Sequence, residues 1–365
     1  MFKKVFLFYL SYLVALTYSQ TLLMLWFLTN GVSYLQMLFY FLVLYVSVLV
    51  TFFLLRNINF SSKFALVFGV TTSALGVLVA NFMTQPAHIF ITAILFGFNI
   101  VFFWTIYNSL HFKYSQSNEN GYKSGAYFLF MPIFSAVLAP LAGFVATKLG
   151  YHFLFLSGIV LYILPFYFAF HMPKFDFKFN FINSARNMEN KLLIAFQGYN
   201  EMLSYNIVPI FTLFFINTPG KLGNFFGYLA ILSAVTAFLN SKISDKFKNR
   251  KLFFYLFISL HSLSYIPLAL VNSLAGWRIF AGISNFTFGL ANPFNLALAV
   301  DHAKGETVDT MLGREIYLNS GRVVMILVAL TVFFFSHSLK VALLLSVLAS
   351  LLYPVVAYFK KVYLK

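Results

Sequence analysis

The chain has little charge for its length and no cysteine. Of its 365 residues only 9% are charged and 61% are hydrophobic, and the mean hydropathy is +0.84. A soluble domain needs roughly 25% charged residues to solvate its surface, so this composition excludes an ordinary water-soluble fold. The absence of cysteine excludes disulfides, thiolate metal sites and cysteine catalysis.

Two further absences narrow the class of activity. The sequence has no G-x4-G-K-[ST] motif, so ATP-driven transport by this chain alone is not expected. No His-x3-His or Glu-x2-His pair occurs among the seven scattered histidines. We therefore expect no metal and no cofactor. An integral membrane enzyme that acts on lipid stays as an alternative function.

Long apolar runs fill most of the chain. A bilayer core about 30 Å thick needs about 20 apolar helical residues. The strands of a membrane barrel would instead alternate over roughly 10 residues. We predict an all-α integral membrane protein with twelve transmembrane helices, at residues 5–26, 33–55, 63–84, 87–109, 122–147, 150–171, 191–217, 222–240, 252–271, 275–300, 315–336 and 339–359.

The basic residues fall almost entirely on alternate separators between these runs. Of the 25 Lys and Arg residues, the exceptions are Lys148, Lys221, Arg278 and Lys340. Short loops rich in Lys and Arg stay in the cytoplasm, so we predict a multi-pass cell-membrane protein with both termini cytoplasmic. The net charge of +16 is then explained by basic residues that lie next to the anionic lipid headgroups of the cytoplasmic leaflet. Membrane lipids are the expected partners, and nucleic acid is not.

The longest break between runs lies near the middle of the chain, at 172–190. Its first part, 173–181, alternates polar residues with Phe, which is typical of an extended or interfacial segment. Six predicted spans precede this break and six follow it. We predict two pseudo-symmetric six-helix bundles, 1–171 and 191–365, joined by a cytoplasmic linker, which is a plan that transporters use.

The segment 241–251, after the eighth span, carries an acidic residue inside a basic cluster. Asp245 is followed by Lys246, and Arg250 and Lys251 close the cluster. In this pattern the chain is similar to the loop signature of the major facilitator superfamily, which it resembles over essentially its whole length. The resemblance implies that Asp245 faces the start of span five when the cytoplasmic side closes, because a helix amino end accepts a carboxylate.

The chain also departs from the family pattern. Ser241 and Lys248 stand where the loop signature has glycines, and the equivalent loop at 56–63 lacks the aspartate. Span five keeps a weakened form of the family's proline–glycine pattern at Pro140 and Gly143. A non-transporting membrane regulator with a transporter fold therefore remains a further alternative.

One acid stands deep within a predicted span. Glu201 lies about ten residues into span seven, roughly 15 Å deep by helix rise. Buried acids are costly in lipid and mark functional sites by default. Gln197, Glu201, Ser204 and Tyr205 would share one face, so we predict a substrate or proton pathway there. The alternative is a protonated carboxyl that bonds a neighbouring helix.

Span eleven and the end of span ten hold the other charges within or near the membrane, and we predict a gating role for them. Arg322 lies one to two turns inside the predicted cytoplasmic boundary. It could pair with Glu315 or with Asp301, bind an anionic substrate, or extend to the lipid interface. Arg314 completes this gating group.

By the family resemblance, spans one, four, seven and ten line a central cavity. Their polar groups are then candidate substrate contacts, and they are Gln20, Asn99, Trp104, Asn292 and Asn295. The amino half carries almost no charge within its spans, so a neutral, amphipathic or weakly ionic solute fits better than a strongly anionic one. We predict a monomeric secondary transporter of a small solute by alternating access, and coupling to protons stays open.

Overall fold

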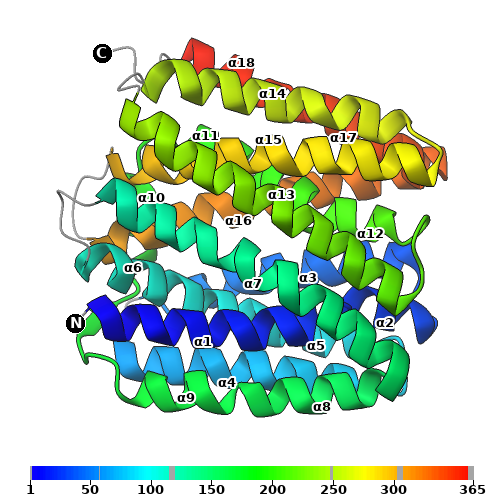
Figure 1. Ribbon diagram of the computed structural model, residues 1–365. Helices are drawn as coiled ribbons and strands as arrows, with labels where there is room; N and C mark the ends of the chain where they lie inside the picture. The colour runs from blue at the N-terminus through cyan, green and yellow to red at the C-terminus, as the bar shows by residue number, and fades with distance from the viewer. Residues whose placement is uncertain (1, 57, 115–119, 247–249, 302–306, 361–365) are drawn as a thin grey trace.

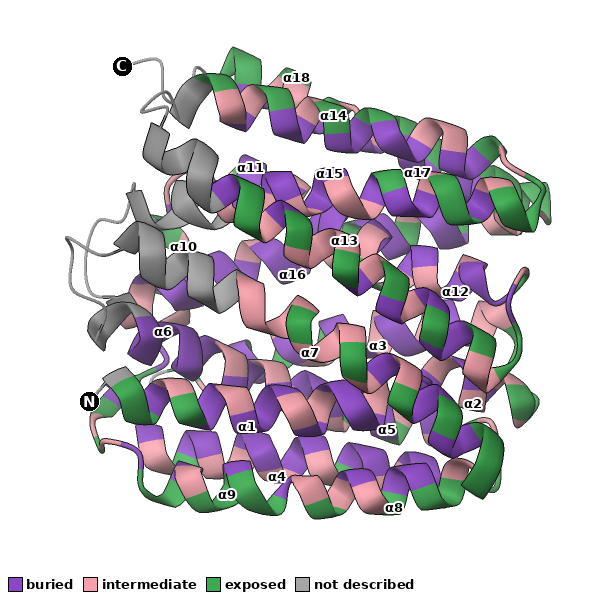
Figure 2. Cartoon of the chain, in the orientation of Figure 1, coloured by how far each residue is buried: buried purple, intermediate pink, exposed green. Residues whose placement is uncertain are grey.

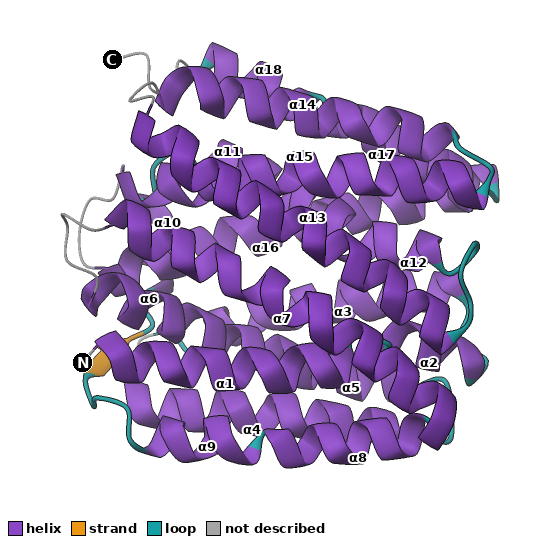
Figure 3. Ribbon diagram, in the orientation of Figure 1, coloured by secondary structure: helices purple, strands orange, loops and turns teal. Residues whose placement is uncertain are grey.

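The computed structural model describes residues 2–56, 58–114, 120–246, 250–301 and 307–360, and for 2, 112–114, 120–128, 241–246, 250–251, 296–301 and 307 the backbone alone. Helices that run side by side make up almost all of it (Figure 1; Figure 3). The start of α1 and the end of α18 lie at the same end of the bundle (Figure 1). We call this the basic end, because the predicted cytoplasmic separators lie there.

The first part of the chain forms nine α-helices, one π-helical turn and one strand. They are α1 (Phe2–Gln20), α2 (Leu23–Thr29), α3 (Tyr34–Leu54), β1 (Asn59–Ser61), α4 (Ser62–Asn81), α5 (His88–Asn99), η1 (Ile100–Trp104), α6 (Thr105–Tyr114), α7 (Asn120–Leu149), α8 (Tyr151–Leu161) and α9 (Ile163–Phe170). The start of α3 shows why the helices begin where they do. Ser33 Oγ accepts from the Gln36 amide N–H, and Gln36 Oε1 accepts from the Ser33 N–H, which is a capping box.

The second part begins with a strand and a short helix and continues with the carboxyl-terminal helices. The elements are β2 (Asp176–Lys178), α10 (Phe181–Asn187), α11 (Lys191–Met202), η3 (Leu203–Ile207), α12 (Val208–Thr212), α13 (Pro219–Lys246), α14 (Arg250–Leu270), α15 (Leu274–Asp301), α16 (Thr307–Ser336), α17 (Leu339–Ser350) and α18 (Leu352–Phe359). The π-helical turns η1 and η3 interrupt the predicted spans four and seven. Such turns often occur at functional sites.

Ten helical stretches of the described residues are long and apolar enough to cross a membrane. They coincide with the predicted spans except the seventh and tenth. Those two segments, 191–212 and α15, are also helical. They carry more polar residues, among them Glu201 and Asn292. The chain is therefore a multi-pass helical membrane protein, and a total of twelve spans stays a prediction.

Two helices extend beyond the predicted spans. α16 begins at Thr307, about two turns before the predicted start of span eleven. α13 continues to Lys246, so Asp245 belongs to the last turn of a helix rather than to a loop. Polar residues at the ends of membrane helices hide these boundaries from a search for apolar runs.

The outer surface of the bundle is apolar. Figure 2 shows exposed residues on the outward faces of the helices, and many of them are large hydrophobic residues such as Leu54, Phe335 and Phe359. A soluble protein rarely exposes contiguous apolar area of this extent. The surface therefore suits contact with acyl chains.

The linker predicted between the halves crosses the basic end as an extended strand followed by a short helix. β2 pairs antiparallel with β1, so that Phe60 stands opposite Phe177. Phe179, in the same extended segment, packs on Phe52 and is almost fully buried. α10 packs on α16, where Ser184 Oγ donates to an Asp309 carboxylate oxygen at 3.0 Å. The predicted extended segment is confirmed, and the linker holds elements of both halves.

Helices from the two parts of the chain meet along two lines. α7 packs on α13, and α16 packs on α3 and α6. At the end of α3 remote from the basic end, the ring of Tyr34 stacks on that of Phe214, with ring centroids 4.1 Å apart. The residues described next lie at the contact between α3, α11 and α16.

Candidate functional site

Two glycines let α11 and α16 approach closely. A Cβ on Gly198 of α11 would overlap the carbonyl oxygen of Leu318, and a Cβ on Gly321 of α16 would overlap that of Ala195. Any larger residue at either position would separate the helices. This close approach brings Glu201, three residues after Gly198, against α16.

Glu201 forms an ion pair with an arginine of α16. Arg322 Nη2 donates to Glu201 Oε2 at 2.5 Å, and Gln197 Nε2 donates to Glu201 Oε1 at 2.8 Å. Arg314 Nη2 lies 3.9 Å from Glu201 Oε1. Only 5% of Glu201 is exposed. Among the partners considered for Arg322, neither Glu315 nor Asp301 takes the place of Glu201 in the described contacts, because the early start of α16 places Arg322 about 23 Å along the helix, level with Glu201.

A second acid–arginine pair lies beside the first. Arg314 Nη1 donates to Glu315 Oε1 at 3.0 Å, and Asn319 Nδ2 donates to Glu315 Oε2 at 3.2 Å. Arg322 Nη1 in turn donates to Asn319 Oδ1 at 2.9 Å. Asn319 therefore joins the two pairs. We call Glu201, Arg314, Glu315 and Arg322 the ion-pair cluster, and it contains equal numbers of acids and arginines.

Tyr45 of α3 connects this cluster to the amino-terminal part of the chain. The guanidinium carbon of Arg322 lies 5.1 Å from the centroid of the Tyr45 ring, within cation–π range. The Tyr45 hydroxyl accepts from Asn206 Nδ2 of η3 at 2.9 Å. Tyr45 could not be predicted from the sequence, since nothing in the local pattern separates it from the other 21 tyrosines.

The predicted common face of span seven holds for Gln197 and Glu201 but not beyond them. Ser204 turns to α14, where its hydroxyl lies 2.5 Å from that of Tyr265. Tyr205 is 48% exposed and packs edge-on against Phe288. The expectation that these residues share a face was wrong because η3 inserts a π-helical turn, which rotates the residues after Met202 out of α-helical phase.

The two asparagines of α15 that were predicted as substrate contacts, Asn292 and Asn295, make different contacts. Asn292 Nδ2 donates to the Tyr205 hydroxyl at 3.4 Å, so these two predicted residues lie together. Asn295 is buried and its Oδ1 accepts from the Tyr353 hydroxyl of α18 at 2.7 Å. Asn295 thus joins α15 to α18 and does not meet Glu201 or Tyr205 in the described contacts.

Gln20 belongs to a network of neutral groups in the amino half. Its Nε2 lies 3.3 Å from both Ser73 Oγ of α4 and the Tyr162 hydroxyl, which follows α8. The Ser73 and Tyr162 hydroxyls are 2.9 Å apart. These contacts hold the end of α1 to two other helices, just before residues 21–22 separate α1 from α2.

Asn99 and Trp104 flank the π-helical turn η1. Asn99 Nδ2 donates to the Gly69 carbonyl at 2.8 Å, and its Oδ1 accepts from the Tyr12 hydroxyl at 2.9 Å. Trp104 is half-buried, with its ring edge-on to that of Tyr12. Both polar atoms of the Asn99 side chain are therefore hydrogen-bonded within the amino half, while Trp104 makes ring contacts.

Two predicted gating acids cannot be placed as side chains. The side chains of Asp245 and Asp301 lie outside the described residues, and their backbones end α13 and α15. Among the described residues, no group of three or more His, Cys, Asp or Glu could hold a metal ion.

A buried histidine lies near the ion-pair cluster without joining it. His261 Nε2 is 3.1 Å from the Tyr265 hydroxyl and 3.4 Å from Ser204 Oγ, and its Nδ1 is 3.4 Å from Thr287 Oγ1. A serine nucleophile requires its histidine to be oriented by an acid. A threonine occupies that place here, so the contacts favour a neutral network between helices.

Several buried polar atoms of the site have no hydrogen-bond partner in the described structure. They are Arg314 Nε, Gln197 Oε1 and Asn200 Oδ1. Buried polar groups are usually paired, and unpaired ones call for an explanation. Their position next to Glu201 is suited to a polar ligand or to water.

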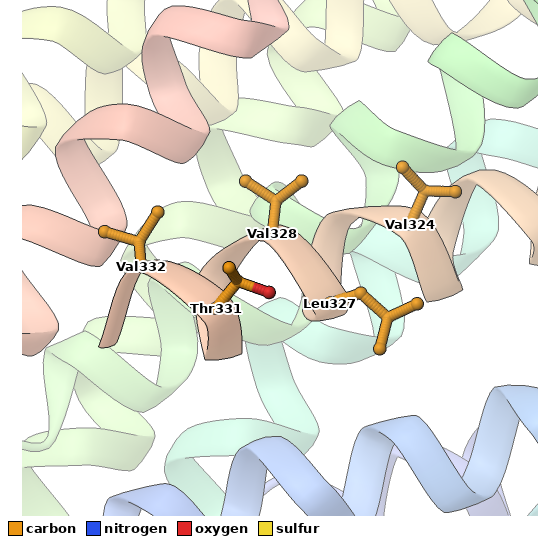
Figure 4. A pocket seen from close by; sticks show the side chains of 5 residues that line it. All are labelled: Val324, Leu327, Val328, Thr331 and Val332. Atoms are coloured by element: carbon orange, nitrogen blue, oxygen red, sulfur yellow. The ribbon is translucent and has the colours of Figure 1, made fainter. Parts of the chain in front are cut away.

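An open groove of about 290 Å³ lies further along α16. Figure 4 shows its lining, which is Val324, Leu327, Val328, Thr331 and Val332. These positions repeat at helical spacing and present methyl groups and a single hydroxyl. The groove offers no charge to orient a polar solute, so the ion-pair cluster is the better candidate site.

Comparison with known sequences gives a distant relative. No protein-family model matches the sequence. The uncharacterized protein YqgE of Bacillus subtilis strain 168 is 25% identical over 349 residues, which cover 86% of this chain and 78% of the relative.

Comparison with solved structures gives transporters. They include a POT family transporter in complex with a thioalcohol-conjugated peptide, a POT family transporter in complex with 5-aminolevulinic acid, and the human organic anion transporter MFSD10 (TETRAN). Each aligns over 97% of this chain with a TM-score of 0.69, at 12%, 12% and 11% identity. The alignments cover 94%, 94% and 98% of those chains. This multi-pass membrane protein therefore shares the major facilitator fold of these transporters.

Proposed function

We propose that the chain is a secondary transporter that moves a small solute by alternating access. The observation that carries the proposal is the buried Glu201–Arg322 pair, which lies between α11 and α16 and under Tyr45 of the amino half. Buried ionisable groups in membrane helices usually serve substrate or ion pathways. The shared fold with transporters supports the same function.

The proposed movement is a rocking of two six-helix halves, 1–171 and 191–365. The stacking of Tyr34 on Phe214 supports closure at the end remote from the basic end, and the packing of α3 on α16 supports closure at the level of the ion-pair cluster. Contacts of α6 and α10 with α16 support closure near the basic end. Alternating access requires these two sets of contacts to break in turn.

Glu201 is the proposed proton carrier. A proton on Glu201 removes its negative charge and therefore breaks the ion pair with Arg322. Arg322 also touches the Tyr45 ring, so its release changes the contact between the halves. Arg314, Glu315 and Arg322 are the proposed gating residues, because α10 packs on the same helix and joins it to the linker.

The topology proposed with this function has twelve spans, the ten already described together with 191–212 and α15. Both termini lie in the cytoplasm of a cell-membrane protein, because the basic separators lie at that end. The transporter works as a monomer among membrane lipids and needs no cofactor. Asp245 and Asp301 keep their proposed gating roles, and Gln20, Asn99 and Trp104 their proposed place along the pathway.

The test is uptake into proteoliposomes. Purified protein is reconstituted with an alkaline interior and incubated with a defined mixture of polar metabolites, and retained solutes are identified by mass spectrometry. We expect at least one solute to accumulate, and to do so less in Glu201→Gln. Accumulation that matches empty liposomes for every solute would count against transport, and equal accumulation in Glu201→Gln would count against proton coupling through Glu201.

A further inference from the structure

The ion-pair cluster is electrically balanced. Glu201 pairs with Arg322, and Glu315 pairs with Arg314, so two negative and two positive groups share one buried site. All four side chains are almost completely buried. A buried charge without a partner is strongly unfavourable, so the site is expected to keep its balance throughout a transport cycle.

The other titratable groups around Glu201 are two tyrosines, a histidine and the charged residues of α16. Tyr45 of α3 and Tyr265 of α14 lie within electrostatic range of its carboxylate. His261 contacts Tyr265 from the same helix. On α16, Arg314, Glu315 and Arg322 are the charged neighbours, and all belong to the cluster.

A proton on Glu201 therefore upsets the balance in one direction. It binds a carboxylate oxygen from solution and leaves the cluster with one surplus positive charge, located on Arg322. No other covalent bond forms or breaks in this step, and the ion pair with Arg322 is lost. Entry of a cation would double the surplus, and entry of a dianion would reverse it. A single negative charge restores neutrality.

We propose, on the basis of the proposed transport function, that the substrate is a monovalent organic carboxylate and that it binds to Arg322 together with one proton on Glu201. Arg322 already binds one carboxylate in this structure, that of Glu201. Arg322 Nη2 donates to the Glu201 carboxylate, and the planar guanidinium of Arg322 matches the planar geometry of a carboxylate. Tyr45 flanks the same guanidinium from the amino half.

Unpaired donors and acceptors beside the pair supply further recognition. Arg314 Nε is a buried donor without a partner, and it belongs to the arginine that lies 3.9 Å from Glu201. Gln197 Oε1 is a buried acceptor without a partner on the residue that donates to Glu201. Arg314 Nε can donate to a carboxylate oxygen of the substrate, and Gln197 Oε1 can accept from a donor group of the substrate. The outcome is electroneutral movement of one proton with one anion.

The first experiment uses acetate as the probe. Glu201→Ala removes the carboxylate and leaves Arg322 unpaired, so acetate should raise the melting temperature of the purified variant in a saturable manner. Acetamide, of equal size and no charge, and sodium chloride at the same ionic strength are the controls. In Glu201→Ala/Arg322→Ala the acetate effect should vanish. An effect that acetamide or chloride equals, or that survives loss of Arg322, overturns the proposal.

The second experiment uses the intact chain and so does not depend on the folding of the alanine variant. If one proton binds with each anion, the apparent affinity of wild-type protein for acetate rises about tenfold for each pH unit lowered while Glu201 is ionised. From about pH 8 to about pH 6 acetate itself stays ionised, because its carboxyl titrates near the range of Asp and Glu. In Glu201→Gln the affinity should be independent of pH. A wild-type affinity that does not change with pH would contradict linked binding.

These results separate this inference from the transport proposal. If proteoliposomes accumulate a neutral or cationic solute through Glu201, the transport proposal stands and the anion inference is wrong. If acetate binds as expected while no solute accumulates in liposomes, the anion site stands and transport is wrong.

Discussion

Removing Glu201 alone should destabilise the protein more than removing both members of the Glu201–Arg322 pair. In Glu201→Gln the guanidinium of Arg322 keeps Asn319 Oδ1 at 2.9 Å and the Tyr45 ring, but it loses its counter-charge. Breaking a buried pair lowers the free energy of unfolding by about 3 to 5 kcal/mol. Because Arg322 keeps these two partners, we expect a loss at the lower end of that range, about 3 kcal/mol. In Arg322→Gln the carboxylate keeps Gln197, so the expected loss is about 2 kcal/mol.

The double variant Glu201→Gln/Arg322→Gln leaves no unpaired charge. We expect it to lose about 2 kcal/mol in total, which gives a coupling of about 3 kcal/mol between the two positions. The assay is unfolding by SDS titration in mixed micelles for wild type, both single variants and the double variant. Asp309→Asn is the matched control, because Asp309 lies on the same helix near its basic end, and it should change stability by less than about 1 kcal/mol. Strictly additive single losses would refute the pairing.

Substitutions at three further positions test the surroundings of this pair and the linker. Tyr45→Phe keeps the ring and loses the hydrogen bond from Asn206, so its free energy of unfolding should fall by about 1 kcal/mol. In Tyr45→Ala the free energy of unfolding should fall by about 3 kcal/mol. Equal losses in the two variants would argue against a ring contact. Gly198→Ala should separate α11 from α16 and destabilise by about 1 to 3 kcal/mol, which a melting-temperature shift would measure. Phe179→Ala should loosen the linker and speed its cleavage by added protease, with about 3 kcal/mol lost from its buried ring; unchanged cleavage would show that the linker is held elsewhere.

The position of Glu201 could be predicted from the sequence because acids are scarce in apolar helices. A carboxyl among apolar residues, with Gln197 one turn before it, predicts a polar face within the protein. Burial of both residues and the hydrogen bond between them agree with that expectation. Local sequence carries this signal because the membrane penalises each charged residue separately.

The partner of Glu201 could not be predicted in the same way. Its identification depends on the start of α16, and about two turns of that helix carry too many polar residues to be found as an apolar run. The outward turn of Tyr205 depends on η3, and a π-helical turn has no reliable sequence signal. Tyr45 enters the site only through the packing of α3 on α16, which no local pattern reveals.

The fold shows the same division between local and non-local information. Alternation of Phe with polar residues at 173–181 predicts an extended segment, and β2 forms there. Its pairing with β1, more than 100 residues earlier, is a tertiary contact. Amides such as Asn295 also look alike in sequence whether they meet a substrate or, as here, a tyrosine on another helix, α18.

The most direct test of the account is a reversible lock across the two halves at the end remote from the basic end. Tyr34 and Phe214 stack there, and the chain has no native cysteine to interfere with thiol chemistry. Tyr34→Cys/Phe214→Cys is reconstituted and joined by a short thiol-specific cross-linker with a reducible bond. We predict that cross-linking stops solute uptake and that reductant restores it, while each single-cysteine variant is unaffected. Full uptake by the cross-linked protein would contradict alternating access.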